Sequence, residues 1–254
     1  MKNLAIVIPC YNEEKGIGKV IDSIPLKKIT ELGFNTKIYV IDNNSTDATS
    51  EVAALHHAIV LFEKQQGKGA ALRKGFSELS VDTDIVIMLD GDNTYKANEI
   101  PRMIEPITSG FCDVVIGSRL EGKTVGESLS FSHRLANWFF TFFTRTMYQT
   151  NVTDTCTGFF AWKKDVIDNL YPHIKSKGFA IEADMITKMA KLGYKIYSVP
   201  ITYERREGES KLSPILDGIK ITLMLFQNIN WKPKIEKKEY FQILDQTENL
   251  EWED

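Results

Sequence analysis

The sequence predicts an α/β protein with a mostly parallel β-sheet and helices on both of its faces. Short apolar runs rich in Ile and Val alternate with segments in which apolar residues recur at helical spacing. Polar or glycine-containing loops close the apolar runs, as expected for short buried strands. Successive β–α units favour a parallel sheet, and right-handed crossovers place the helices on both faces.

The first half of the chain carries the clearest patterns. Strands are expected at Leu4–Ile8, Lys37–Ile41, Ile59–Phe62, Ile85–Leu89 and Val114–Ile116. Helices are expected between them at Glu14–Ile24, Ala48–Leu55, Gly69–Leu79 and Asn98–Ile107. Ligands of open parallel sheets bind beyond the carboxyl ends of the strands. The loops after the first, second and fourth strands should therefore share one ligand-binding rim.

The second half has longer helical stretches, an aromatic-rich segment and weaker strand signals, beginning after Gly117. No linker rich in Pro, Gly or Ser interrupts the chain, so we expect a single domain over residues 1–234. Within it, the change of pattern predicts a functional division between residues 1–117 and 118–234. Residues 235–254 contain seven acidic side chains against two lysines, which predicts an acidic C-terminal tail.

Composition argues against several classes of protein. The 254 residues are 43% hydrophobic, which is enough for a packed core, and 31 basic against 34 acidic side chains give no sign of nucleic-acid binding. Cys10, Cys112 and Cys156 lack C-x-x-C spacing, so they predict neither a zinc site nor a disulfide framework. The four histidines do not cluster as metal ligands would.

The most informative motif is Asp90-Gly91-Asp92, which follows the apolar run that ends at Leu89. Residues i and i+2 of an extended chain point the same way, so Asp90 and Asp92 would present two neighbouring carboxylates at the end of a strand. Such a pair suits a divalent cation that bridges the protein to a diphosphate. The alternative is an exposed turn with two solvated acids.

A second candidate is Gln66-Gly67-Lys68-Gly69, which precedes an expected helix. Its backbone N–H groups and the Lys68 ammonium could lie near a diphosphate, although the spacing is not that of a Walker motif. A plain glycine turn is the alternative. Lys68 is accordingly a candidate for the donor site.

Six motifs occur in an order and at spacings that resemble one family. They are Ile8-Pro9-Cys10-Tyr11-Asn12-Glu13-Glu14, Val40-Ile41-Asp42-Asn43-Asn44-Ser45-Thr46-Asp47, Asp90-Gly91-Asp92, Gly117-Ser118-Arg119, Asp154-Thr155-Cys156-Thr157-Gly158-Phe159 and Arg205-Arg206-Glu207-Gly208-Glu209-Ser210-Lys211. The set resembles family 2 glycosyltransferases, especially polyprenyl-phosphate glycosyltransferases of the dolichyl-phosphate mannose synthase type. The resemblance covers roughly residues 4 to 225, and it implies the A-type glycosyltransferase fold with a Rossmann-like sheet.

The resemblance implies where the nucleotide-sugar donor binds. Contacts to base and ribose would come from Pro9, Tyr11, Glu13, Ile41 and Asp42, with Gly91 and Lys68 also in the donor site. This chain has Asp42-Asn43 where many members of the family have two Asp residues. A carboxylate accepts a hydrogen bond from a ring N–H of uracil or of guanine, so both UDP-linked and GDP-linked sugars remain open. A turn followed by a helix cap is the alternative role of residues 42–47.

The metal site is implied at the same place. Asp92 would bind the metal directly, and Asp90 would contact the metal or the donor sugar, with Mg²⁺ or Mn²⁺ as the ion. Members of the family often carry Gln two residues after the second Asp, whereas this chain has Thr94. Thr94 would then bind a metal-held water or nothing.

The expected acceptor is a membrane-borne phosphate, which needs positive charge beside an apolar approach. The segment Leu129–Tyr148 offers Arg134 and Arg145, at a spacing that allows both arginines to face one side of a helix. They lie among the aromatic side chains of Trp138, Phe139, Phe140, Phe142 and Phe143. Such a helix suits the headgroup level of a membrane. Aromatic packing inside the protein is the alternative. A second apolar helix, Ile215–Ile229, carries too many polar residues for a full span.

By the same resemblance, Arg119 and Arg134 would bind the lipid phosphate, and Arg205 and Lys211 would lie on a loop over the diphosphate and metal. We expect Arg206 to face solvent. The implied enzyme is peripheral on the cytoplasmic face of a membrane, where it takes dolichyl or another polyprenyl phosphate as acceptor. It would feed glycan or protein glycosylation, with a membrane protein as a possible further partner.

A phosphate acceptor simplifies the expected chemistry. Its second pKa is about 6, so at neutral pH it attacks the anomeric carbon without losing a proton, and the reaction inverts that centre. Two other functions are considered. A family 2 enzyme with a sugar or protein hydroxyl as acceptor would need a base, and the available carboxylates of the second half are Asp154, Glu182 and Asp184. Replacing Asp154 or Asp184 should then abolish turnover. A nucleotide-sugar-binding subunit without catalysis is less compatible with Asp90, Asp92, Arg119 and Arg205 together.

Overall fold

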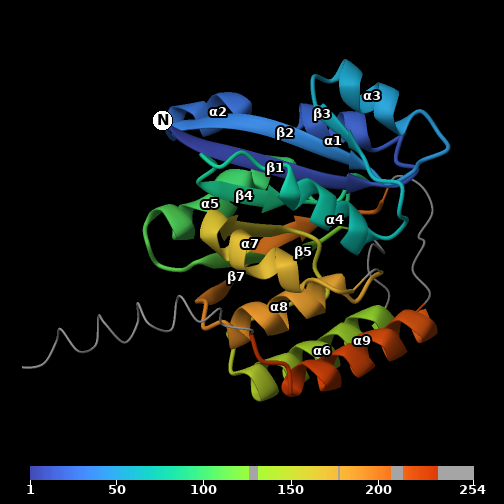
Figure 1. Ribbon diagram of the computed structural model, residues 1–254, viewed down its shortest axis with the longest axis vertical. Coiled ribbons are helices and arrows are strands. Elements are labelled where there is room, and N and C mark those ends of the chain that lie inside the picture. Colours follow the sequence, from blue (N-terminus) through green and yellow to red (C-terminus); the bar gives the residue numbers. More distant parts are fainter. Residues whose placement is uncertain (126–130, 177, 207–213, 234–254) are drawn as a thin grey trace, which may run out of the picture.

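The computed structural model describes residues 1–125, 131–176, 178–206 and 214–233, and shows the seven strands of these residues in one sheet (Figure 1). The strands are β1 (Lys2–Cys10), β2 (Phe34–Asp42), β3 (Ile59–Phe62), β4 (Ile85–Met88), β5 (Val114–Thr124), β6 (Phe160–Lys163) and β7 (Ile196–Tyr203). Their order in the sheet is β3-β2-β1-β4-β6-β5-β7. The predicted strands of the first half are all present.

The pairing is parallel except around β6. Strands β1, β2, β3 and β4 are mutually parallel, with Ile8 opposite Val40 and Val7 opposite Met88. Strand β6 runs antiparallel to both β4 and β5, and β7 returns parallel to β5. The sheet is therefore mostly parallel, as predicted, with one reversed strand inserted between β4 and β5. Neither β6 nor β7 was expected from the sequence pattern.

Helices cover both faces of the sheet. They are α1 (Ile17–Asp22), α2 (Leu26–Glu31), α3 (Thr49–Leu55), α4 (Lys68–Ser77), α5 (Ile100–Thr108), α6 (Phe131–Tyr148), α7 (Lys164–Leu170), α8 (Ile181–Lys191) and α9 (Pro214–Ile229), with short 3₁₀ turns at Ala97–Glu99 and Tyr171–His173. Side chains of alternate β1 residues enter two different cores. Leu4, Ile6 and Ile8 pack with α1, α2 and α5, whereas Ala5 and Val7 pack with α4, α7 and α8.

Helices α6 and α9 form a third layer. They lie side by side along α8, on the side away from β1, β2 and β3 (Figure 1). A separate core joins them to α8 through Phe140 and Tyr148 of α6, Ala183 of α8, and Met224 and Leu225 of α9. Helix α8 therefore connects this outer pair to the sheet, and its first residues lie beside the loops at the carboxyl ends of β1 and β4.

Candidate functional site

A cavity of about 290 Å³ opens at the carboxyl edge of β1 and β4. Six segments build its walls: the loops after β1, β2 and β4, the glycine turn that leads into α4, the chain that leads into α8, and the residues after β7. The expected residues that line it are Pro9, Tyr11, Glu13, Lys68, Asp90, Gly91 and Asp92. The rim predicted from the ends of the strands is thus confirmed.

The two carboxylates of the Asp90-Gly91-Asp92 motif differ in their surroundings. Asp92 is buried, and its Oδ1 accepts hydrogen bonds from the Thr94 hydroxyl at 2.6 Å and the Thr94 N–H at 3.1 Å. Burial and the neighbouring Asp90 raise the pKa of Asp92, although Arg206 and Thr94 act in the opposite direction. Arg206 and Thr94 therefore do not fully offset the effects of burial and Asp90 on the Asp92 carboxylate. Thr94 orients this carboxylate, a role that the sequence pattern did not suggest.

Asp90 is held from two sides. Lys68 Nζ lies 2.5 Å from Asp90 Oδ1, and a Cβ added at Gly158 would lie 2.4 Å from Asp90 Oδ2. Only glycine fits at position 158, because the backbone there passes directly against the carboxylate. Asp90 is thereby fixed at the wall of the cavity with its side chain 27% exposed.

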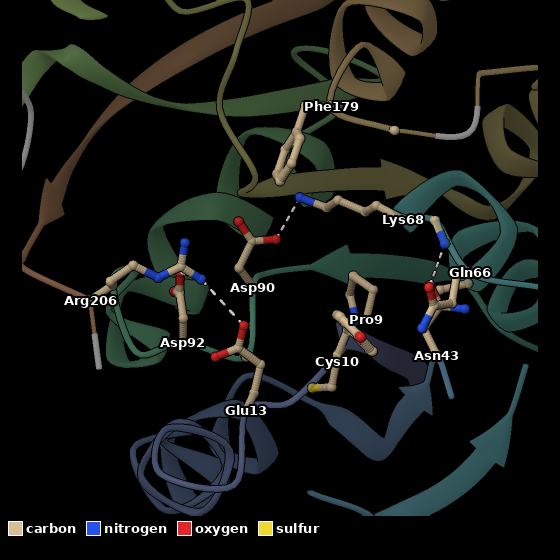
Figure 2. Close-up of a pocket in the computed structure, with 15 residues that line it drawn as sticks. Pro9, Cys10, Glu13, Asn43, Gln66, Lys68, Asp90, Asp92, Phe179 and Arg206 are labelled. Atoms are coloured by element: carbon tan, nitrogen blue, oxygen red, sulfur yellow. Dashed lines mark hydrogen bonds and ion pairs between the residues drawn. The ribbon is translucent and has the colours of Figure 1, made fainter. Parts of the chain in front are cut away.

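Lys68 connects Asp90 to Glu182, an acid of the second half whose contact with Lys68 was not expected from the sequence. Its Nζ lies 2.6 Å from Glu182 Oε1, at the start of α8 (Figure 2 shows Lys68 reaching Asp90). Burial alone would lower the pKa of Lys68, but Asp90 and Glu182 outweigh it and raise that pKa, so the amine is charged. Burial raises the pKa of Glu182. Lys68 was predicted from its glycine turn, where Gly67 has φ of 126°.

The arginine at the cavity is Arg206, not Arg205. Arg206 Nη2 lies 2.9 Å from Asp92 Oδ2 and 3.3 Å from Glu13 Oε1 (Figure 2). The Arg205 side chain, in contrast, is exposed. The expectation that Arg206 faces solvent is wrong. The two residues follow β7, where successive side chains point to opposite sides, and sequence alone did not settle which side faces the cavity. Lys211 lies outside the described residues.

Two predicted nucleotide contacts do not line the cavity. Ile41 is fully buried in the core on β2. The Asp42 carboxylate accepts from the Ser45 N–H at 2.9 Å and from the Ser50 hydroxyl at 2.5 Å, which is the alternative turn role. The next residue, Asn43, lines the cavity instead and accepts from the Gly67 N–H at 2.7 Å.

The two arginines expected at the acceptor phosphate lie in different surroundings. Arg119 is 7% exposed and makes a two-point contact with Asp154, with Nε 2.8 Å and Nη2 2.9 Å from its oxygens. Nη2 also donates to the Cys156 carbonyl at 2.6 Å, and Asn137 donates to Asp154. Arg119 is thus paired with Asp154 inside the protein. The expectation that Arg119 binds the lipid phosphate did not include this pair. Arg134 is exposed on α6.

The two acids proposed as bases for a hydroxyl acceptor are both in buried ion pairs. Asp154 is fully buried with Arg119. Asp184 is 2% exposed, lies 2.7 Å from Lys188 Nζ and accepts from Asn228 at 2.8 Å. Neither lines the cavity.

The side chains present fit a hard divalent cation. Asp90 and Asp92 supply carboxylate oxygens at one cavity, which is the ligand type that Mg²⁺ and Mn²⁺ prefer. Within the described ranges no group of three His, Cys, Asp or Glu side chains could hold a metal alone. Magnesium commonly binds through one or two carboxylates together with substrate phosphates. Two aspartates beside a diphosphate-sized cavity match that pattern.

The outer surface of α6 and α9 is unusually apolar. Ten large side chains on these two helices are exposed by 48% to 81%: Phe131, Leu135, Trp138, Phe139, Phe142 and Met147 on α6, and Leu216, Ile219, Leu223 and Phe226 on α9. We call these ten residues the apolar face. The internal-helix alternative for α6 therefore holds only for the side that carries Phe140 and Phe143, which pack against α8 and α9. In the part of the chain that the structure describes, no helix is both long and apolar enough to span a bilayer.

Comparison with known proteins identifies the family. A family model described as glycosyl transferase family 2 matches residues 5–171. The chain belongs to this family. It is therefore a glycosyltransferase, and the order of its motifs already indicated this relationship.

Two of the relatives have a polyprenyl phosphate in their names. The chain is 31% identical over 219 residues to the dolichyl-phosphate hexose transferase of Haloferax volcanii, covering 86% of this chain and 90% of that one. It is 30% identical over 222 residues to the undecaprenyl-phosphate mannosyltransferase of Micrococcus luteus, covering 82% and 86%. It is 32% identical over 216 residues to the low-salt glycan biosynthesis hexosyltransferase Agl6 of Haloferax volcanii, covering 85% of this chain but only about half, 51%, of that protein.

A solved structure confirms the fold. Glucosyl-3-phosphoglycerate synthase from Mycobacterium tuberculosis, in complex with Mn²⁺, UDP-glucose and phosphoglyceric acid, superposes with a TM-score of 0.69 at 20% identity. The match covers 92% of this chain and 81% of that one. The A-type glycosyltransferase fold predicted from the motifs is therefore confirmed.

Proposed function

We propose that this glycosyltransferase moves a sugar from a UDP- or GDP-linked donor to dolichyl or another polyprenyl phosphate, with inversion at the anomeric carbon. One observation carries the proposal. The acidic cavity and the apolar face are joined through α8, which begins with Glu182 beside the cavity and packs on α6 and α9. This connection supports a donor site and a lipid-facing surface that are linked through one helix.

The cavity supports a nucleoside diphosphate donor. Lys68 and Arg206 bring two positive charges to its walls, and Asp90 and Asp92 supply two carboxylates. A divalent cation bound there would neutralise charge on the departing nucleoside diphosphate. Lys68, held between two acids, would keep its ammonium near the same charge.

The buried acids support a phosphate acceptor. A hydroxyl acceptor needs a base that reaches the cavity, yet Asp154 and Asp184 are both held in buried ion pairs away from it. A phosphate oxygen attacks without prior loss of a proton. Glu182 is the remaining acid near the cavity in the described part of the second half, and it binds Lys68. Arg134, exposed on α6, is our candidate for the acceptor phosphate.

The apolar face supports a membrane surface as the place of reaction. Aromatic and aliphatic side chains of this size, with the exposed Arg134, Arg145 and Lys232 nearby in sequence, suit the headgroup region of a bilayer. We place the enzyme on the cytoplasmic side, where nucleotide sugars are expected. Residues 235–254, the expected acidic tail, lie outside the described residues, and a membrane-protein partner remains part of the proposal.

The test of this function is a donor panel. Radiolabelled UDP- and GDP-linked mannose, glucose and N-acetylglucosamine are each incubated with the enzyme, Mn²⁺ and a short isoprenyl phosphate, and label is counted in the organic phase. We expect one donor to give metal-dependent transfer. Transfer to sugar or peptide hydroxyls in parallel reactions, with none to the isoprenyl phosphate, would contradict the acceptor class.

The membrane surface is tested separately by flotation with anionic phospholipid vesicles. Phe142→Ser on the apolar face should reduce the bound fraction, by about tenfold in the partition coefficient, because it removes a large apolar side chain from the lipid. The matched control is Phe62→Ser. Phe62 on β3 and Phe142 are both 57% exposed, but Phe62 lies at the far edge of the sheet. Equal loss in both variants would contradict a specific lipid-facing surface.

A further inference from the structure

The cavity contains more acidic than basic side chains. Four carboxylates, from Glu13, Asp90, Asp92 and Glu182, are paired with two cations, Lys68 and Arg206. For these paired groups the net charge is therefore −2 when all are ionised. One divalent cation would balance this charge of −2. It can bind only if the basic side chains leave a carboxylate oxygen free to coordinate it.

The two basic side chains are not held equally. Lys68 makes contacts of 2.5 Å and 2.6 Å to its two acids, and its side chain is 16% exposed. Arg206 is 25% exposed and touches both of its acids through Nη2 alone. Its Nε is buried without a hydrogen-bond partner among the described residues. Arg206 is thus the less firmly bound of the two, and it retains an unused buried donor.

Comparison with Arg119 shows what Arg206 lacks. Arg119 places both Nε and Nη2 on the carboxylate of Asp154, which is the two-point geometry that guanidinium groups form with carboxylates and phosphates. Arg206 has the same edge, but only Nη2 of that edge is in contact with an acid. The Nε–Nη2 edge of Arg206 therefore makes no two-point contact among the described residues, and it could form one with a phosphate group once Nη2 leaves its acids.

Arg206 also lies where a cation would bind. Asp92 Oδ1 is engaged by Thr94, and Oδ2 is the oxygen that Arg206 contacts at 2.9 Å. Arg206 and a metal ion therefore compete for Asp92 Oδ2. The competition is electrostatic as well as spatial, because a guanidinium beside a carboxylate repels a second cation.

We propose that Arg206 is an exchangeable counterion: it neutralises Asp92 in the empty site and moves to the donor diphosphate when a divalent cation takes its place on Asp92. This inference rests on the proposed function, since it requires a diphosphate donor. It assigns the diphosphate contact to Arg206 and couples metal binding to donor binding. The empty enzyme would bind metal weakly, and the complete donor complex would bind it well.

The test is a titration of Mn²⁺ followed by the electron paramagnetic resonance signal of the free ion, without any sugar or lipid. The proteins are wild type, Arg206→Gln and Arg205→Gln. Arg205→Gln is the matched control, because it removes the same charge from an adjacent but exposed position. Without nucleotide, Arg206→Gln should bind Mn²⁺ more tightly than either other protein, on the order of tenfold. Arg206→Lys should return the affinity towards wild type.

The titration is then repeated with saturating UDP and, separately, GDP. The nucleotide that binds should increase the Mn²⁺ affinity of every protein. The increase should be about threefold or more larger in wild type and Arg205→Gln than in Arg206→Gln, because only the first two retain the arginine that moves to the diphosphate. Circular dichroism checks that each variant is folded.

Two results would overturn the exchange. Arg206→Gln binding Mn²⁺ no more tightly than Arg205→Gln would mean that Arg206 does not compete with the metal. An equal gain with nucleotide in both variants would mean that Arg206 does not move to the diphosphate. Failure of the proposed function appears elsewhere, as absent transfer to isoprenyl phosphate in the donor panel, and does not change either titration.

Discussion

Two sets of ion pairs in this enzyme use the same chemistry for different purposes. In the core, Arg119 with Asp154 and Lys188 with Asp184 are nearly inaccessible, and further hydrogen bonds from neighbouring residues complete each pair. At the cavity, Lys68 holds Asp90 and Arg206 holds Asp92. The side chains of Lys68, Arg206 and Asp90 are 16% to 27% exposed, and that of Asp92 is 8% exposed.

The difference lies in what remains unsatisfied. Buried ion pairs persist when hydrogen bonds use every remaining donor and acceptor, so removing one partner leaves an uncompensated charge. In the cavity, Arg206 Nε has no hydrogen-bond partner among the described residues, and burial together with Asp90 raises the pKa of Asp92. We infer that the core pairs maintain the fold, and we propose that Arg206 in the cavity exchanges its acidic partner for a ligand.

The largest expected effect is on catalysis, from Asp92→Asn. This change removes an oxygen ligand for the cation, and we expect sugar transfer to fall by about 10³-fold. The melting temperature should stay at or above that of wild type, because burial and Asp90 disfavour the Asp92 charge. Transfer rates and thermal unfolding measure the two quantities. A loss of transfer below about tenfold would assign Asp92 to the structural set.

The next effect is on stability, from Arg119→Ala. Asp154 would remain buried without its guanidinium, at a cost of about 3–5 kcal/mol in the free energy of unfolding. Urea denaturation measures the cost. Arg134→Ala is the control, since that arginine is exposed and its loss should change stability by less than about 0.5 kcal/mol. Comparable stability of the two variants would show that Arg119 is not a core residue.

A smaller effect separates the two acceptor classes. Glu182→Gln weakens one of the two contacts that position Lys68, so KM for the donor should rise by about three- to tenfold with little change in kcat. If the acceptor were a hydroxyl and Glu182 its base, kcat would instead fall by about 10²–10⁴-fold. Asp184→Asn on the same helix is the control, because it should lower stability and leave KM unchanged.

The smallest effect is a pH dependence beside the Lys188–Asp184 pair. Burial lowers the pKa of His173, and the neighbouring charges of Lys188 and Lys175 lower it further. The His173 ring packs against Trp231, with 5.3 Å between the ring centroids. The unfolded chain then binds a proton more readily, so stability is retained above pH about 6.5 and decreases as the pH falls below it. Melting temperatures at pH 7.5 and 5.5 should differ less in His173→Gln than in wild type. An unchanged difference would mean that other groups cause the slope.

The sequence predicted the parts of the site that local patterns encode. Apolar runs located β1, β2 and β4, and the polar residues that end them placed Glu13, Asp90 and Asp92 at one rim. The Gly-Lys-Gly turn similarly identified Lys68.

Long-range pairing was not predictable in the same way. Arg119 resembles a phosphate ligand until Asp154, 35 residues away, is seen to bind it. Glu182 lies 114 residues from Lys68, and nothing in its local sequence marks the contact. Strand β6 has only four residues, too few for a clear alternating pattern, and its neighbours in the sheet are distant in sequence.

The position of β6 has a consequence for engineering. This strand belongs to the second half of the chain, but it lies between β4 of the first half and β5, which crosses residue 118, and the chain that leads into it brings Gly158 against Asp90. A chimera joined at residue 118 would therefore divide β5 and take the interior strand β6 from the foreign parent. Donor preference is better altered by exchanging loops on an intact scaffold than by recombining whole halves.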